Sequence, residues 1–395
     1  MHIGYCTNIH LGEDWVSHFA ILQDSLPSVK GRISPDKPMG VGLRLANQAS
    51  HDLQDTALVA TLRQWLDDNG LYVFTMNGFP YGGFHNTRVK DQVHAPDWTT
   101  DDRVDYTIRM FRVLAQLLPD TLTDGGISTS PISYRYWWKT PDELAAATET
   151  GTRQMLRVVE ELIALRQQTG KWLHLDIEPE PDGILESGPE FLDWYQTWLL
   201  PVGITHLGEK LGLSADEAAA AIRDHIQLCY DVCHFAVGYE NPASVLDQLQ
   251  ARGIRVGKIQ VSSALKVDFS SQAEEKLAAI AGFDEPTYLH QVVARLTDGS
   301  LKRFADLPEA LQAFDAATHL EWRVHFHVPL FVDNYGLLES TQSAIRDVLA
   351  LNQKRPFTDQ LELETYTWGV LPESMQLPLN ESISREMAWV MALHQ

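Results

Sequence analysis

The chain has 395 residues, and its 44% hydrophobic and 21% charged content is that of a globular protein, which excludes the disordered and fibrous classes. Its formal net charge of −22 at pH 7 repels phosphate backbones, so we expect no nucleic-acid partner. The three cysteines form no CxxC pair, the N-terminus lacks a signal-peptide pattern, and no apolar run is long enough for a membrane span, so we expect a cytoplasmic protein.

Short strand-like runs alternate with helix-like stretches along the whole chain. The expected strands cover 2–8, 41–45, 71–77, 126–132, 172–181, 226–234, 256–264 and 361–368. The expected helices cover 15–26, 50–69, 101–118, 141–168, 189–211 and 214–226. Eight β–α units favour a closed (β/α)8 TIM barrel of parallel strands. An open doubly wound sheet is the alternative, but no GxGxxG motif follows the first strand.

Local signals set the expected ends of the first helices. Pro27 is predicted to end the first helix, because proline removes a backbone donor and clashes with the preceding turn. Ser50 is predicted to cap the next helix, and Asn69-Gly70 to end it.

The segment 79–98 after the third strand is long, aromatic and rich in glycine, which is typical of a functional loop. We interpret it as a lid over the catalytic end of the barrel, with His85 as a substrate contact. A fixed loop packed on the barrel rim is the alternative interpretation.

Between the seventh and eighth strands, 288–307 has the pattern of a β-hairpin with an Asp298-Gly299 turn. A second strand-like run follows at 322–331. We expect 288–331 to be an insertion at the barrel mouth, within a single domain that spans 1–395.

Polar side chains gather where the strands of the expected barrel end, which is where barrel active sites lie. The residues concerned are Asp176, Glu178 and Glu180 on the fifth strand, Asp231 and His234 on the sixth, Gln260 and Ser262 on the seventh, and Glu362 and Glu364 on the eighth. Converging carboxylates repel one another, and a divalent cation would neutralise them. His234, His325 and His327 could complete a mixed shell, which suits Mn, Zn, Co or Fe.

Structural roles compete with these interpretations. A single acidic residue at a strand end is more often a helix cap or a surface residue, and only the coincidence of several favours a site. One of His325 and His327 could be structural, and Cys233 is expected to be a small buried apolar residue. We treat His94, His174 and His319 as structural or surface residues.

Four motifs carry a resemblance to a known family: LDIEPEP (175–181), YDVCH (230–234), KIQVSSA (258–264) and LELETYTW (361–368). Together they resemble the xylose isomerase-like TIM barrels, a superfamily of sugar epimerases, sugar-phosphate isomerases and endonuclease IV-type enzymes. With IGYCTNIH and NGFPYGGFH, the sequence most resembles the EboE family of Ebo-type metabolite-traffic proteins, over nearly the whole chain.

The resemblance implies a metal-dependent epimerase or isomerase that transfers a proton next to a carbonyl of a small sugar, sugar phosphate or cyclitol. It implies metal ligands at Glu178, Asp231 and Glu364, with Glu178 and Glu364 also acting as acid and base. The family often has a histidine where Gln260 stands, and His327, or His325, could replace it. The expected substrate contacts are Arg44, Asn77, His85, Glu180, His234 and Gln260.

Two rival functions stay open at this stage. One is a hydrolase or lyase in which the same metal activates water. The other is a metabolite-binding or carrier protein without catalysis, which Gln260 favours because glutamine is a poorer ligand than imidazole. The metal content separates an enzyme from a binder, and the sequence leaves a homo-oligomer open.

Overall fold

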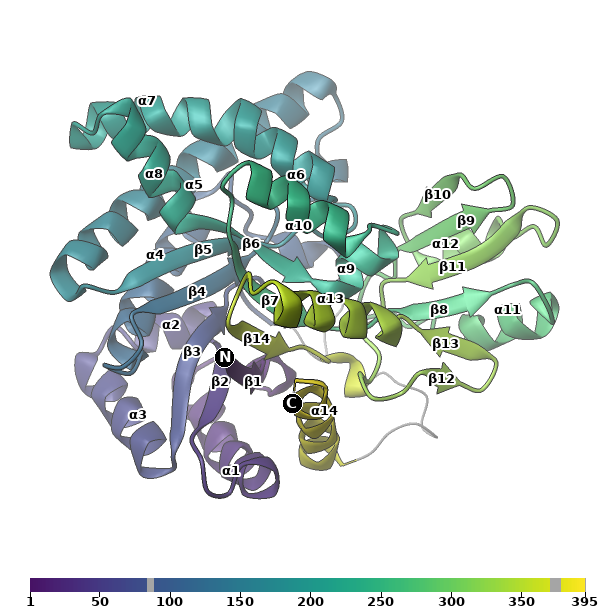
Figure 1. Ribbon diagram of the computed structural model, residues 1–395, viewed down its shortest axis with the longest axis horizontal. Coiled ribbons are helices and arrows are strands. Elements are labelled where there is room, and N and C mark those ends of the chain that lie inside the picture. The colour runs from purple at the N-terminus through teal and green to yellow at the C-terminus, as the bar shows by residue number, and fades with distance from the viewer. Residues whose placement is uncertain (84–88, 370–377, 395) are drawn as a thin grey trace.

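The computed structural model describes residues 1–83, 89–369 and 378–394, and its centre is a barrel of eight parallel strands (Figure 1). The strands are β1 (His2–Tyr5), β2 (Met39–Arg44), β3 (Leu71–Asn77), β4 (Asp124–Thr129), β5 (Trp172–Ile177), β6 (Ile226–Asp231), β7 (Val256–Val261) and β14 (Gln360–Leu363). They pair in the order β1-β14-β7-β6-β5-β4-β3-β2. A parallel bridge between Cys6 and Gly42 joins the two ends of this order, so the barrel is nearly closed. The expected TIM barrel is thereby confirmed.

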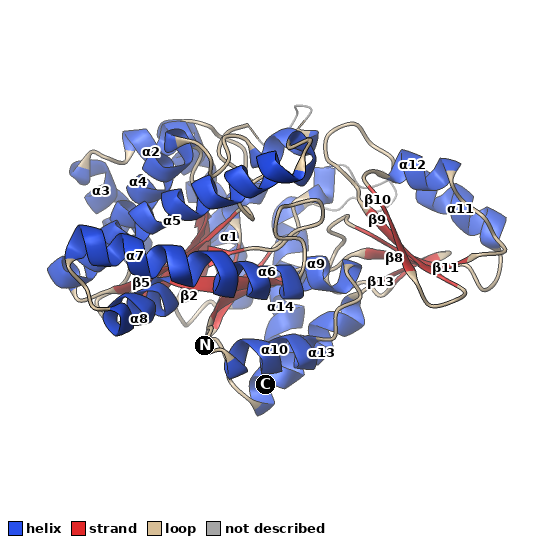
Figure 2. Cartoon of the chain, turned by 90° about the horizontal axis from the view of Figure 1, so that it is seen from above, coloured by secondary structure: helices blue, strands red, loops and turns tan. Residues whose placement is uncertain are grey.

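Helices surround the strands, as Figure 2 shows. They are α1 (Trp15–Ile33), α2 (Asn47–Asp52), α3 (Thr56–Asp68), α4 (Asp101–Leu117), α5 (Pro141–Thr169), α6 (Gly188–Trp194), α7 (Leu200–Leu211), α8 (Ala215–His225), α9 (Val232–Val237), α10 (Pro242–Ala251), α13 (Gln342–Lys354) and α14 (Leu379–Leu393). Their apolar faces and the outward side chains of the strands share one hydrophobic core. Within the described residues, every helix is too short or too polar to cross a bilayer.

Two local predictions were wrong. Pro27 lies inside α1, and the helix continues past it to Ile33. Leu26 and Val29 on either side of it are fully buried, so packing on the barrel outweighs the cost of a proline within the helix. Ser50 lies inside the short helix α2, and the side chain of Asp55 caps α3 instead.

The chain between β7 and β14 forms a second sheet, which lies to one side of the barrel (Figure 1). Its elements are β8 (Leu265–Asp268), α11 (Ala273–Ala281), β9 (Val292–Leu296), β10 (Leu301–Phe304), α12 (Leu307–Gln312), β11 (His319–Val324), β12 (Asn334–Tyr335) and β13 (Leu338–Ser340). The six strands pair in the order β10-β9-β11-β8-β13-β12 over their own hydrophobic cluster.

The expected hairpin is present in this sheet as β9 and β10, and Gly299 adopts a φ of 85° in its turn. The sheet begins earlier and ends later than the expected range 288–331. Three residues separate the end of β7 from the start of its strand β8, and no glycine or proline marks a break between them, so the sequence pattern alone does not reveal a second strand.

Candidate functional site

A pocket opens at the carboxyl ends of the barrel strands and encloses about 340 Å³, including its open mouth. Its ionisable lining comprises Glu178, Glu180, His234, His325, His327 and Glu364. Residues that directly follow β5, β6, β11 and β14 therefore meet in one place, as the sequence predicted for most of them.

Three carboxylates form the centre of this pocket. One oxygen each from Glu178, Asp231 and Glu364 lies within 4.8 Å of the other two, and all three side chains are buried. Oε1 of Glu364 accepts hydrogen bonds from the side-chain amides of Asn8 at 2.6 Å and Asn77 at 3.0 Å. These bonds fix the direction of the Glu364 carboxylate toward the other two acids.

The second carboxylate is held from its own strand end. Asp231 caps α9, where its Oδ1 accepts from the His234 backbone N–H at 2.9 Å and from the Ser262 hydroxyl at 2.7 Å. Its Oδ2, like Oε2 of Glu178, is buried without a hydrogen-bond partner. Two carboxyl oxygens are thus free to bind a ligand inside the pocket.

The electrostatics of this group call for a positive charge. Burial raises the pKa of Glu364 to about 8, with further contributions from Asp231 and Glu362. Burial, Glu364 and Asp231 together raise the pKa of Glu178 well above its ordinary range. Three buried acids so close together cannot all ionise unless a cation joins them.

Hydrogen bonds determine which nitrogen carries the proton in two of the imidazole rings. Nδ1 of His234 lies 3.0 Å from the Pro179 carbonyl oxygen, and Nδ1 of His327 lies 3.1 Å from the Glu364 carbonyl oxygen. Because a carbonyl only accepts, Nδ1 must be the protonated nitrogen, and Nε2 keeps its lone pair. Burial keeps both rings neutral, since it lowers the pKa of His234 to about 3 and that of His327 to about 4.

The third ring, His325, is oriented in the same way. Its Nδ1 lies 2.8 Å from Oε1 of Gln291, and Nε2 of Gln291 donates to the Pro181 carbonyl at 3.3 Å, which fixes the direction of this amide. Nε2 of His325 consequently faces Nε2 of His234 at 3.1 Å with a lone pair on each nitrogen. Two facing lone pairs repel each other, and a cation bound by one or both nitrogens removes the repulsion.

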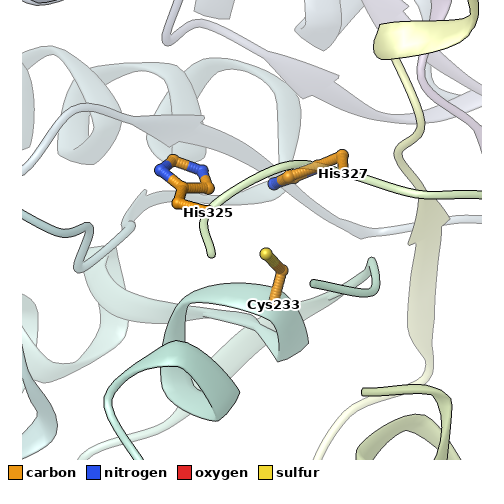
Figure 3. Close-up of side chains that lie close together, drawn as sticks. All are labelled: Cys233, His325 and His327. Carbon is orange, nitrogen blue, oxygen red and sulfur yellow. The ribbon is translucent and has the colours of Figure 1, made fainter. Parts of the chain in front are cut away.

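Figure 3 shows His325 and His327 together with Cys233. The Cys233 sulfur and one nitrogen of each ring lie within 4.8 Å of one another. Cys233 is fully buried and also packs against Val237 and Ala264. The prediction of a small buried apolar residue describes this packing but not the two imidazoles beside the thiol.

A second layer of charge lies inside the barrel below the pocket. Lys258 and Glu362 form a fully buried ion pair, and the Lys258 ammonium also donates to the Met76 carbonyl at 3.1 Å. Gly42 provides room for this pair, because a Cβ there would lie 1.9 Å from Oε1 of Glu362. The pair neutralises itself, so it leaves the carboxylates above it without a dedicated counter-charge.

His174 occupies the bottom of the same interior column. Its Nδ1 lies 2.6 Å from Oδ1 of Asp176. Although burial opposes the charge, Asp176 and Asp124 raise the pKa of His174 to about 10. The histidine that we treated as structural is therefore one half of a buried ion pair, and Asp176 belongs to that pair and not to the pocket.

The structure also places the other predicted substrate contacts. Asn77 and Glu180 line the pocket, and Gln260 is buried in register with Asp231 and Glu362 on the neighbouring strands. Arg44 is buried at the end of β2, where its guanidinium donates to the Gly82 carbonyl and so holds the start of the loop.

His85 lies outside the described residues. Of the loop 79–98, the described residues Phe79, Pro80 and Val93 line the pocket. The loop therefore forms part of the pocket wall, while its movement as a lid stays a prediction.

Sequence reasoning missed Tyr366, Gln291 and Lys258. Tyr366 lines the pocket two residues after Glu364, so the alternation along the chain could have indicated it. Lys258 lies two residues before Gln260 and therefore on the same face of β7. Because a lysine is rarely buried, the sequence did not suggest that it faces the barrel interior, and only the three-dimensional structure shows that it pairs with Glu362. For Gln291 the sequence offers no signal.

The residues fit a divalent cation. Carboxylate oxygens without partners, neutral imidazoles with free Nε2 lone pairs and the excess of buried negative charge are all features of a metal-binding pocket. Nitrogen and oxygen donors together suit Mn, Zn, Co or Fe.

No protein-family model and no curated protein matches this chain. Among solved structures it is similar to the IOLI protein with a binding zinc atom, at 13% identity over 100% of this chain and 98% of that chain, with a TM-score of 0.47. It is also similar to a xylose isomerase domain protein from Planctomyces limnophilus, at 13% identity over 100% and 95% of the two chains, with a TM-score of 0.47. A third is D-allulose 3-epimerase from Methylomonas sp. in complex with D-allulose, at 13% identity over 73% and 82%, with a TM-score of 0.38.

Proposed function

We propose that this protein is a metal-dependent isomerase or epimerase that acts on a small polyhydroxylated carbonyl compound, namely a sugar, sugar phosphate or cyclitol. The observation that carries the proposal is the group of three buried carboxylates, Glu178, Asp231 and Glu364, whose oxygens lie within 4.8 Å of one another in a small pocket. We take these three as metal ligands, together with Nε2 of His327, which is buried and has no hydrogen-bond partner.

The chemistry proposed for the chain's own residues is proton transfer. Glu178 would take the proton from the carbon next to the carbonyl, and Glu364 would return one to the neighbouring carbon or to the opposite face. A base and an acid work best when the pKa lies near the working pH. Burial raises the pKa of Glu364 above its ordinary value in the metal-free protein, and a bound cation would lower it again. A bound cation would supply polarisation of the substrate carbonyl.

The surrounding residues would position the substrate and the carboxylates. Asn8 and Asn77 hold Glu364 from one side, and Glu180 offers a further carboxylate to a substrate hydroxyl on the pocket wall. We assign the protein to an Ebo-type metabolite pathway of the cytoplasm, an assignment that rests on the sequence motifs.

A non-catalytic metabolite-binding protein is the second candidate, and Gln260 favours it. This side chain occupies the strand-seven position where the resembling family often has an imidazole ligand, and it is fully buried beside Asp231. A weaker cation site would lower catalysis more than it lowers ligand binding.

The test combines metal analysis with hydrogen exchange. The purified protein is loaded with Mn, Co or Zn and incubated with a panel of aldoses, ketoses and inositols in D2O, and NMR follows loss of the C–H signal next to the carbonyl. We expect metal-dependent exchange that Glu178→Gln and Glu364→Gln abolish and that Glu209→Gln, on the exposed surface of α7, leaves unchanged. Binding of a panel member without exchange would favour the carrier, and absence of both binding and exchange for the whole panel would contradict the proposal.

A further inference from the structure

A second group of potential ligands lies beside the carboxylates, and the proposed function uses only His327 of it. We infer that Cys233, His325 and His327 form a second cation position, selective for a thiophilic metal such as zinc or cobalt, next to the position of Glu178, Asp231 and Glu364. The inference rests on the proposed function only for the first of these two cations.

The geometry of the three donors carries the inference. The Cys233 sulfur and a nitrogen of each ring lie within 4.8 Å of one another, and all three side chains are buried. Both Nδ1 atoms are occupied, in His325 by Oε1 of Gln291 and in His327 by the Glu364 carbonyl. Only the Nε2 atoms remain as ligands, and Nε2 of His327 has no other partner.

The second sheet holds His325 in this position. The His325 backbone N–H donates to the Gln291 carbonyl at 2.9 Å, and Nδ1 of His290 lies 3.1 Å from the His325 carbonyl oxygen. Nε2 of His290 in turn lies 2.9 Å from Oε1 of Glu285. Hydrogen bonds of the His325 backbone N–H, its carbonyl oxygen and its Nδ1 fix the position of the ring. Cation binding therefore costs little conformational entropy of this side chain.

Donor chemistry separates the two positions. Thiolate and imidazole are soft or borderline ligands that favour zinc and cobalt, whereas three carboxylates are hard ligands that favour manganese or magnesium. Tetrahedral zinc–sulfur and zinc–nitrogen bonds of about 2.3 and 2.0 Å place the donors about 3.3 to 3.5 Å apart, so donors within 4.8 Å of one another need only a small further approach. Binding breaks the S–H bond and releases its proton to solvent, because the thiolate is the ligand.

The two positions divide the available ligands. When both cations are bound, His327 would serve the second cation instead of the first, and the three carboxylates alone would hold the first. His234 would face the second position, since its Nε2 lies 3.1 Å from that of His325. One face of the second cation would remain open to the pocket, as in catalytic zinc sites with three protein ligands.

The test uses the full chain, stripped of metal with a chelator and titrated with Co(II). We expect two bound equivalents and a near-ultraviolet charge-transfer band from a thiolate on cobalt. Cys233→Ser and His325→Gln should each remove the band and lower the affinity for the second Co(II) about 100-fold, while the affinity for the first Co(II) is unchanged. Cys229→Ala, a change at another buried cysteine, should retain the band.

A complementary variant separates this inference from the proposed function. Glu178→Gln should lower the affinity for the Co(II) bound by the carboxylates and leave the thiolate band unchanged. Circular dichroism establishes that each variant is folded, and His325→Gln provides a second route if Cys233→Ser is not. One equivalent only, or two equivalents without a thiolate band, would overturn the inference and leave the carboxylate site of the proposed function intact.

Discussion

The stability of the metal-free protein should depend on pH in part through Glu364, and replacing this residue by glutamine should remove its share of that dependence. The folded protein raises the pKa of Glu364 from 4.5 to about 8, chiefly by burial and then through Asp231. Between these two pH values the unfolded chain has lost the proton and the folded chain has kept it. The folded state therefore binds more protons, and its stability falls as the pH rises.

The magnitude follows from the size of the shift. An interval of about 3.5 pH units, at 1.36 kcal/mol per unit, corresponds to about 5 kcal/mol of unfolding free energy lost between pH 4.5 and pH 8. Glutamine keeps an oxygen that can accept from Asn8 and Asn77 and has no proton to lose. Glu364→Gln should consequently be more stable than the unmodified protein at pH 8 by several kcal/mol, and similar to it near pH 5.

Urea unfolding in the presence of a chelator, at intervals from pH 5 to pH 9, measures the effect. Glu209→Gln, at an exposed position on α7, is the matched control and should follow the unmodified protein. Adding a divalent cation at pH 8 should restore stability to the unmodified protein more than to Glu364→Gln. Parallel pH profiles for the protein and Glu364→Gln would refute the reasoning, because Glu364 would then ionise freely in the folded state.

The remaining predictions concern the metal, the barrel interior and the loop. Glu178→Gln should lower the affinity for a divalent cation about 10- to 100-fold at pH 7, since it removes one anionic ligand and keeps the shape; isothermal titration of the metal-free protein measures this, and an unchanged affinity would contradict it. Gly257→Ala should destabilise the protein by several kcal/mol or prevent folding, because its Cβ would lie 1.9 Å from Oδ1 of Asp176. Gly31→Ala, whose Cβ would have no atom within 4 Å, should be neutral or slightly stabilising. Thermal unfolding compares the two variants, and equal effects would argue against close packing around Gly257. His85→Ala should weaken binding of a polyol or sugar and leave the metal content unchanged, and normal ligand binding in that variant would count against the lid.

The sequence by itself determined the architecture of the barrel. Eight apolar runs separated by amphipathic stretches are a local pattern, and parallel strands with helical crossovers close in few ways. The carboxyl ends of such strands share one rim, so the positions of Glu178 directly after β5 and of Glu364 directly after β14 were enough to bring them together.

Helix ends were less predictable, because tertiary packing competes with local preference. Pro27 should have stopped α1, yet the fully buried Leu26 and Val29 continue the apolar face of that helix against the barrel. The strand β8 was also missed, because it follows β7 after only three residues and no glycine or proline separates the two, although they join different sheets.

Only the tertiary structure decided how the histidines serve the site. His325 and His327 lie more than ninety residues from Cys233 along the chain, and the second sheet carries them back to it. Gln291 fixes the proton of His325 on Nδ1, and the Glu364 carbonyl does the same for His327. No sequence pattern connects these acceptors to the two rings. Which nitrogen lone pairs face the pocket depends on such long-range hydrogen bonds. Strands and helices, in contrast, follow from periodicities over a few residues. The sequence therefore indicated the barrel and its acidic residues but not the arrangement of the imidazoles.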